Sequence, residues 1–70
     1  MRDVAISKEP VELYKILKFE GIASSGAEAK HLVAEGRVLV NEKVETRKRN
    51  KIVSGDIIEC GDEKIRIVLM

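Results

Sequence analysis

Cysteine, histidine and tryptophan are scarce in this sequence, and none of its many carboxylates falls in a recognisable catalytic constellation. It has one cysteine, one histidine and no tryptophan in 70 residues. Cys60 and His31 cannot supply the paired ligands of a closed zinc site, and no Gly-rich phosphate loop of the Walker or dinucleotide-binding type is present. Cys60 lies in an apolar pattern, which favours a small core residue over a nucleophile. We therefore expect no enzymatic activity, no metal and no cofactor.

Disulfides and long hydrophobic runs are missing as well. A lone cysteine cannot form a disulfide within the chain, which is typical of the reducing cytoplasm. No apolar run is long enough to cross a membrane, and Met1 to Ile6 lack the apolar core of a signal peptide. We expect a cytoplasmic protein with one domain over residues 1–70, because so short a chain has a thin core without a deep substrate pocket. The lack of a second long apolar stripe favours a monomer.

The charge is distributed unevenly, although the net charge is only +1. The segment from Lys30 to Lys51 holds seven basic and three acidic residues. Its net charge is therefore +4, and the rest of the chain carries −3. A neutral total thus hides a basic half that is suited to a polyanion.

The first half of the sequence predicts a short strand followed by two helices. Residues 4–6 alternate apolar and polar side chains, as in a strand with one buried face. A helix is expected over Pro10–Glu20, because proline suits the first helical position and the apolar residues recur at helical spacing. Ser25 and Glu28 stand at capping-box spacing, which predicts a second helix that ends at Gly36.

The second half of the sequence changes to a strand pattern. Val38 and Val40 alternate with other residues before a polar turn at Asn41. Two apolar segments, Ile57–Cys60 and Lys64–Val68, flank a Gly-Asp pair, which predicts a β-hairpin. The element order favours an α+β fold in which two helices pack against a small, mainly antiparallel sheet.

The outer face of the second predicted helix combines small residues with hydrogen-bonding ones. With the apolar stripe turned inward, Ala27, Lys30, His31 and Ala34 share this face. Small residues let a bulky polyanion approach the helix, where Lys30 would meet a phosphate. An ordinary solvated helix face is the alternative interpretation.

The run Arg47–Lys51 is the strongest local signal. Four cations in five residues repel one another unless an anion neutralises them, and phosphates do so with release of counterions. Arginine adds a planar fork that can grip a phosphate at two points. A solubility loop has a similar composition, but the uneven charge and Lys30 together favour nucleic acid.

Three segments, Gly21–Lys30, Glu35–Asn41 and Gly55–Ile58, follow one another in a pattern that resembles the S-four RNA-binding domain, or αL motif. The resemblance extends from about Pro10 to Val68 and is nearest to short, free-standing bacterial proteins. It implies a helix pair whose outer surface, with an adjoining loop, lies against structured RNA. Ribosomal RNA is the first expected target and tRNA the second, in ribosome assembly or other ribosome-associated work.

One position departs from the family pattern. The family usually has arginine directly after the serine that opens the second helix, and this chain has Gly26 there. We hypothesise that Arg47, Lys48 and Arg49 compensate from the neighbouring loop. The full set of expected RNA-binding residues is Lys30, His31, Arg37, Arg47, Lys48, Arg49 and Lys51.

Two other functions stay open from the sequence alone. The basic face could bind an acidic protein partner, or the chain could be the accessory RNA-binding subunit of a separate RNA-modifying enzyme. RNase sensitivity separates the first alternative from RNA binding. Tyr14 and Phe19 are the only aromatic residues, too few for a base-stacking sheet, so recognition of RNA by shape and phosphate is expected.

Overall fold

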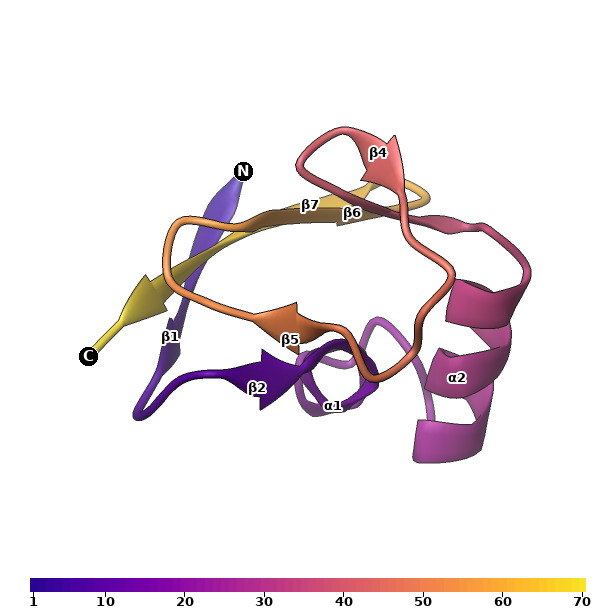
Figure 1. The fold of residues 1–70 in the computed structure, drawn as a ribbon, viewed down its shortest axis with the longest axis horizontal. Coiled ribbons are helices and arrows are strands. Elements are labelled where there is room, and N and C mark those ends of the chain that lie inside the picture. Colours follow the sequence, from indigo (N-terminus) through magenta and orange to yellow (C-terminus); the bar gives the residue numbers. More distant parts are fainter.

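The computed structural model describes residues 1–70, which form seven strands and two helices (Figure 1). In chain order these are β1 (Arg2–Ile6), β2 (Val11–Glu12), α1 (Leu13–Phe19), α2 (Gly26–Ala34), β3 (Val38–Val40), β4 (Lys43–Val44), β5 (Lys51–Ile52), β6 (Ile57–Cys60) and β7 (Glu63–Leu69).

Five of the strands form one sheet in the order β1-β7-β6-β3-β4. β1 runs parallel to β7, and the other neighbours are antiparallel. The predicted α+β arrangement of two helices on a mainly antiparallel sheet is therefore confirmed. The predicted hairpin is present too: Gly61 and Asp62 join β6 to β7, and Gly61 has a φ of +60°, which glycine adopts without strain.

One core cluster of 13 buried residues lies between the sheet and the helices. Successive strand residues point to opposite faces, so β7 buries Ile65 and Ile67 while Lys64 and Arg66 stay exposed. The helices contribute Leu13, Ile16, Leu17, Ala29 and Val33. Each fully buried leucine or isoleucine stabilises the fold by roughly 1.5–3 kcal/mol, and these contacts hold α1 and α2 against the sheet.

Both helices end in the same hydrogen-bonded turn around a glycine. After α2, the N–H of Gly36 donates to the carbonyl of Val33 (3.0 Å), and the N–H of Arg37 donates to the carbonyl of Leu32 (3.1 Å). Gly36 has a φ of +75°, and this pair of bonds is the Schellman motif. Gly21 has the same role after α1. The predicted ends of both helices are thus correct.

The start of the first helix was predicted incorrectly. α1 begins at Leu13 rather than at Pro10, and the two residues between them form β2. β2 pairs antiparallel with β5 in a separate two-stranded sheet, where Val11 lies opposite Ile52. Ile52 is fully buried. The partner that draws these residues out of the helix is far away in the sequence, so the local pattern did not reveal it.

The start of α2 follows the prediction with one difference. The hydroxyl of Ser25 caps the helix by accepting the N–H of Glu28 (3.1 Å). The carboxylate of Glu28 turns back to the N–H of Ser24 (2.9 Å) rather than to that of the capping serine. The reciprocal pair of bonds therefore spans one residue more than a standard capping box.

Candidate nucleic-acid interface

Tyr14 of α1 lies between two cations that come from different parts of the chain. The ammonium nitrogen of Lys30, on α2, is 4.7 Å from the centroid of the tyrosine ring. The guanidinium carbon of Arg49, from the loop between β4 and β5, is 5.6 Å from the same point. The quadrupole of an aromatic ring attracts cations within about 6 Å. One tyrosine thus joins cations of α2 and of the loop.

That loop, residues 45–50, is called the basic loop below, and main-chain hydrogen bonds fasten it to the start of α1. The N–H groups of Leu13 and Tyr14 donate to the carbonyls of Asn50 (2.9 Å) and Lys48 (3.0 Å). The first N–H groups of a helix have no partner within it, and Glu12 offers no side-chain cap here. The basic loop supplies the missing acceptors, and Figure 1 shows it descending from β4 past the helices to β5.

The cations of α2 and of the basic loop differ in how far they are neutralised. Lys30 and Lys48 take part in no ion pair of the structure. Arg49 approaches a carboxylate oxygen of Glu12 at 3.5 Å, and the same carboxylate binds Lys15 at 3.2 Å. The hydrogen bond from Lys15, with a smaller effect of Arg49, lowers the pKa of Glu12. We use the name Tyr14 cluster for Tyr14, the two cations over its ring (Lys30 and Arg49), and Lys48, whose main-chain carbonyl accepts the Tyr14 N–H.

Arg47 is in the basic loop but faces its own carboxylate. Its Nε and Nη2 atoms lie 3.0 and 3.1 Å from the two carboxylate oxygens of Glu45, and its main-chain N–H donates to the same group at 2.9 Å. These bonds lower the pKa of Glu45 and raise that of Arg47. The guanidinium remains exposed to solvent, with its charge balanced locally.

The remaining predicted RNA-binding residues lie outside the Tyr14 cluster. His31 and Arg37 share the carboxylate of Glu35 after the last turn of α2, at 3.2 and 3.3 Å. Lys51 lies opposite Glu12 in the β2–β5 pair. The seven predicted residues are therefore divided: two lie over the Tyr14 ring, Lys48 is bonded to Tyr14 through its main chain, one is paired within the basic loop, two stand at the end of α2, and one lies on the small sheet.

The outer face of α2 matches the predicted arrangement except at Lys30. Ala27, His31 and Ala34 are exposed, and Lys30 is half-buried because it leans on the tyrosine ring. Of the predicted inward residues, Leu32 is only half-buried. Sequence reasoning missed Tyr14 as the organising residue. No local signal marks it, since its partners come from elsewhere in the chain.

Gly26 borders the Tyr14 cluster. A Cβ placed on this residue would lie 4.0 Å from the nearest carbons of Tyr14 and Lys18, which is ordinary van der Waals separation. A side chain therefore fits at this position without displacing its neighbours. The arginine that the family pattern carries there would stand beside the tyrosine, on the surface where Lys30 and Arg49 already gather.

Asn41 has a structural role. Its side-chain oxygen accepts the N–H of Ile57 (2.9 Å), and its side-chain amide donates to Asp56 (3.0 Å). Asn41 and Glu42 have φ angles of 52° and 71°, as in the two-residue turns that join antiparallel strands. The residue thereby ties the β3–β4 turn to the start of β6.

Cys60 lacks the features of a reactive thiol, and no metal site is apparent. Cys60 is half-buried against the core, and burial raises the pKa of its thiol, which disfavours the reactive thiolate. Its neighbours across the sheet are Val38 and Glu63. No group of three or more His, Cys, Asp or Glu side chains is placed to hold a metal ion. Neither helix has the length and apolar character needed to span a membrane.

The chain is similar to known proteins over nearly its whole length. The family model of the S4 domain matches residues 4–68. YbcJ of Escherichia coli K12, a candidate RNA-binding protein, is 45% identical over 69 residues, which cover 97% of this chain and 99% of YbcJ. RlbA of Bacillus subtilis 168, provisionally assigned as a ribosome maturation protein, is 34% identical over 56 residues, covering 80% of this chain and 79% of RlbA.

The fold is also shared with a solved structure. The solution structure of YbcJ, described as revealing an αL motif involved in RNA-binding, superimposes with a TM-score of 0.73 at 45% identity. The match covers 94% of this chain and 85% of that one. This chain therefore belongs to the S4 domain family, and its two helices and sheet have the fold of the αL motif.

Proposed function

We propose that this protein binds structured RNA without catalysing a reaction, and that the Tyr14 cluster is the centre of the interface. The main observation behind this proposal is that Lys30 of α2 and Arg49 of the basic loop both lie over the ring of Tyr14. The candidate RNA-binding role of YbcJ and the αL motif of its structure support RNA as the polyanion.

The geometry suits a phosphate backbone that crosses between α2 and the basic loop. Lys30 and Lys48 have no carboxylate to release before they meet a phosphate, and Arg49 has only a long contact to Glu12. Because main-chain bonds already hold the basic loop on α1, binding orders little additional chain and loses little entropy. Each phosphate that is neutralised releases counterions into the solvent.

The other four predicted cations should contact RNA less strongly. His31, Arg37 and Arg47 each have a carboxylate partner, so a phosphate must compete with that carboxylate. Lys51 is unpaired but lies beyond Arg49 on β5. We therefore expect Lys30, Lys48 and Arg49 to contribute most of the affinity and these four residues to contribute less.

The target that we propose is folded ribosomal RNA, with tRNA as the second choice. The provisional role of RlbA in ribosome maturation supports this order. A surface with a single, partly covered tyrosine can recognise the shape of a folded RNA and the positions of its phosphates, but it cannot stack against a series of bases. We propose that the chain acts as a cytoplasmic, single-domain monomer during ribosome assembly.

The experiment is a titration against ribosomal RNA fragments, tRNA and duplex DNA at several salt concentrations. The test variant changes Lys30, Lys48 and Arg49 to glutamine. A matched control removes the same charge from exposed positions of the five-stranded sheet, by substituting glutamine for Lys43, Lys64 and Arg66.

RNA affinity should fall with a log–log salt slope of about −3 to −4, since each phosphate contributes about −0.7 to −0.9. The test variant should reduce the slope by about 2, and the control should leave it near the wild-type value. Equal losses in the two variants would contradict the proposed interface. Failure of the wild-type protein to bind any RNA at low salt would instead favour an acidic protein partner.

A further inference from the structure

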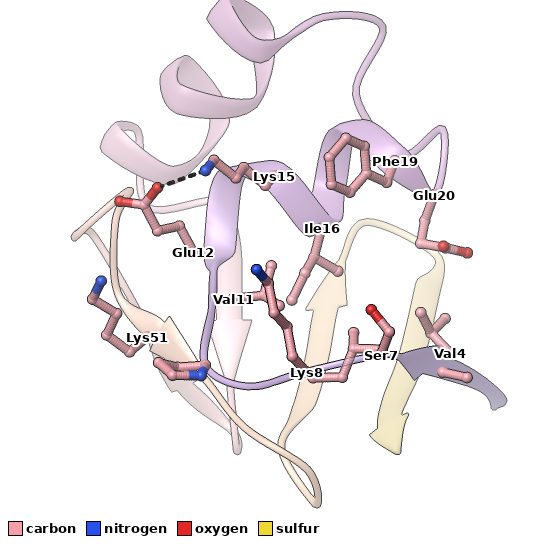
Figure 2. A pocket seen from close by; sticks show the side chains of 13 residues that line it. Val4, Ser7, Lys8, Val11, Glu12, Lys15, Ile16, Phe19, Glu20 and Lys51 are labelled. Atoms are coloured by element: carbon pink, nitrogen blue, oxygen red, sulfur yellow. Dashed lines mark ion pairs between the residues drawn. The ribbon is translucent and has the colours of Figure 1, made fainter. Parts of the chain in front are cut away.

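A groove lies beside the Tyr14 cluster, between β1, β2 and α1 (Figure 2). Its volume is about 640 Å³, within the range of roughly 300–1,000 Å³ that small-molecule sites occupy. The apolar part of its lining consists of Val4, Ala5, Ile6, Val11, Ile16 and Phe19. The groove therefore offers an apolar floor large enough for a planar group.

Phe19 is the most exposed part of this floor. Its residue surface is 69% exposed although it ends α1, whereas Ile16 and Leu17 of the same helix are buried in the core. Figure 2 shows the ring beside Ile16 at one end of the groove. The core does not need this ring, and an uncovered aromatic face is a stacking surface for a nucleic-acid base.

The charged side chains that line the groove give it a net positive charge. Lys8 and Lys51 take part in no ion pair, and Figure 2 shows Lys8 reaching from the segment after β1 toward α1. The acidic groups are already occupied: Glu12 binds Lys15 at 3.2 Å, and Glu20 binds the guanidinium of Arg2 at 2.7 Å. The charge therefore complements an anion with a flat apolar part.

The groove is continuous with the Tyr14 cluster. Lys51 lines the groove and directly follows the basic loop. Glu12 also lines it, and its carboxylate contacts Arg49, which stands over the Tyr14 ring. A strand of RNA that leaves the cluster along the basic loop reaches the groove next.

We propose that this groove binds an unpaired nucleotide of the same RNA, with its base on Phe19 and its phosphate near Lys8 and Lys51. This inference rests on the proposed function. It adds a preference: the protein selects structured RNA in which a single-stranded segment adjoins the duplex.

The test compares a blunt RNA hairpin with the same hairpin carrying a short uridine overhang. Phe19→Ser removes the stacking surface and Lys8→Gln removes a rim cation, and neither residue belongs to the Tyr14 cluster. Leu69→Ser is the matched control, because Leu69 is also an exposed apolar residue (47%) but lies outside the groove. Thermal unfolding of each variant confirms that it is folded.

The overhang should tighten binding to the wild-type protein by at least about fivefold, the lower end of what one base stacked on an aromatic ring provides. Phe19→Ser should lose this gain and keep the affinity for the blunt hairpin, Lys8→Gln should reduce the gain, and Leu69→Ser should retain it. Phe19→Trp adds a direct readout, because the chain has no other tryptophan and its fluorescence should be quenched only by the overhang.

Equal affinities for the two hairpins, or a gain that survives Phe19→Ser, would overturn the groove inference alone and favour a peptide as its occupant. Absence of binding to both hairpins at low salt would overturn the proposed function, and the inference with it.

Discussion

The ammonium nitrogen of Lys30 stands 4.7 Å from the centre of the Tyr14 ring, and this contact joins the outer side of α2 to α1. Arg49 approaches the same ring from the basic loop. The three segments that would face RNA are therefore coupled through one side chain. The charges are positioned before any ligand arrives, which reduces the entropy lost on binding.

Replacing Tyr14 should separate the effects of the ring from those of the hydroxyl group. Tyr14→Leu removes two cation–π contacts, each worth about 0.5–1 kcal/mol at exposed sites, so the free energy of unfolding should fall by about 1–2 kcal/mol. RNA affinity should fall several-fold because Lys30 and Arg49 lose their common support. Tyr14→Phe keeps the ring and should resemble the wild type. Urea unfolding and RNA titration provide the two measurements, and similar behaviour of the two variants would argue against a role for the ring.

Restoring the family arginine should strengthen RNA binding with little change in stability. Gly26→Arg puts a better helix former at the first position of α2, but a cation at a helix N-terminus is opposed by the helix macrodipole, so the two effects on stability oppose each other. The substitution adds a cation beside the Tyr14 cluster. The salt slope of RNA binding should become steeper by about 0.7–0.9, the contribution of one phosphate. Gly26→Ala is the control, since it provides the helix effect without the charge. If both variants bound RNA equally, the position would not face the RNA.

Glu45 should restrain the RNA affinity of the basic loop. Glu45→Gln removes the carboxylate that holds the guanidinium of Arg47 and keeps an oxygen that can accept the main-chain N–H. We expect tighter RNA binding and a steeper salt slope. In a second variant that also carries Arg47→Gln, the gain should disappear. Unchanged affinity of the single variant would show that Arg47 does not meet a phosphate.

The same ion pair should make stability depend on acid pH. Arg47 lowers the pKa of Glu45 in the folded protein below its ordinary value of 4.5. A carboxyl group whose pKa is lowered by folding contributes stability above its unfolded pKa, and this contribution is lost as the pH falls through the folded pKa. Glu45→Gln should therefore be slightly less stable than the wild type at neutral pH. The difference should vanish below the folded pKa, as measured by urea unfolding across the acid range, and a constant difference would exclude this linkage.

The sequence predicts the fold better than it predicts the site, for physical reasons that particular residues illustrate. The glycines after both helices and the alternation of Ile65 and Ile67 are local signals, and local rules decide the structure there. Tyr14 and the basic loop meet only after the chain has folded back on itself, as do β2 and β5. The composition of Arg47–Lys51 could not show that one of its arginines is paired with Glu45 and another with the tyrosine.

The exposure of Phe19, in contrast, follows from local spacing. At the rotation of an α-helix, Phe19 points about 110° away from the face that Leu13, Ile16 and Leu17 bury, and its residue surface is 69% exposed. A helical pattern identifies such an apolar residue outside the core face but not what would cover it.

The most direct test of the central claim is to follow the backbone amide signals of the protein by NMR while a ribosomal RNA fragment is added. The account predicts that the largest shift changes cluster at Tyr14, Lys30, Lys48 and Arg49, with smaller ones at Phe19 and Lys8 when the RNA carries an unpaired end. Changes centred on the outer side of β7, around Lys64 and Arg66, or changes of equal size over the whole chain, would contradict it.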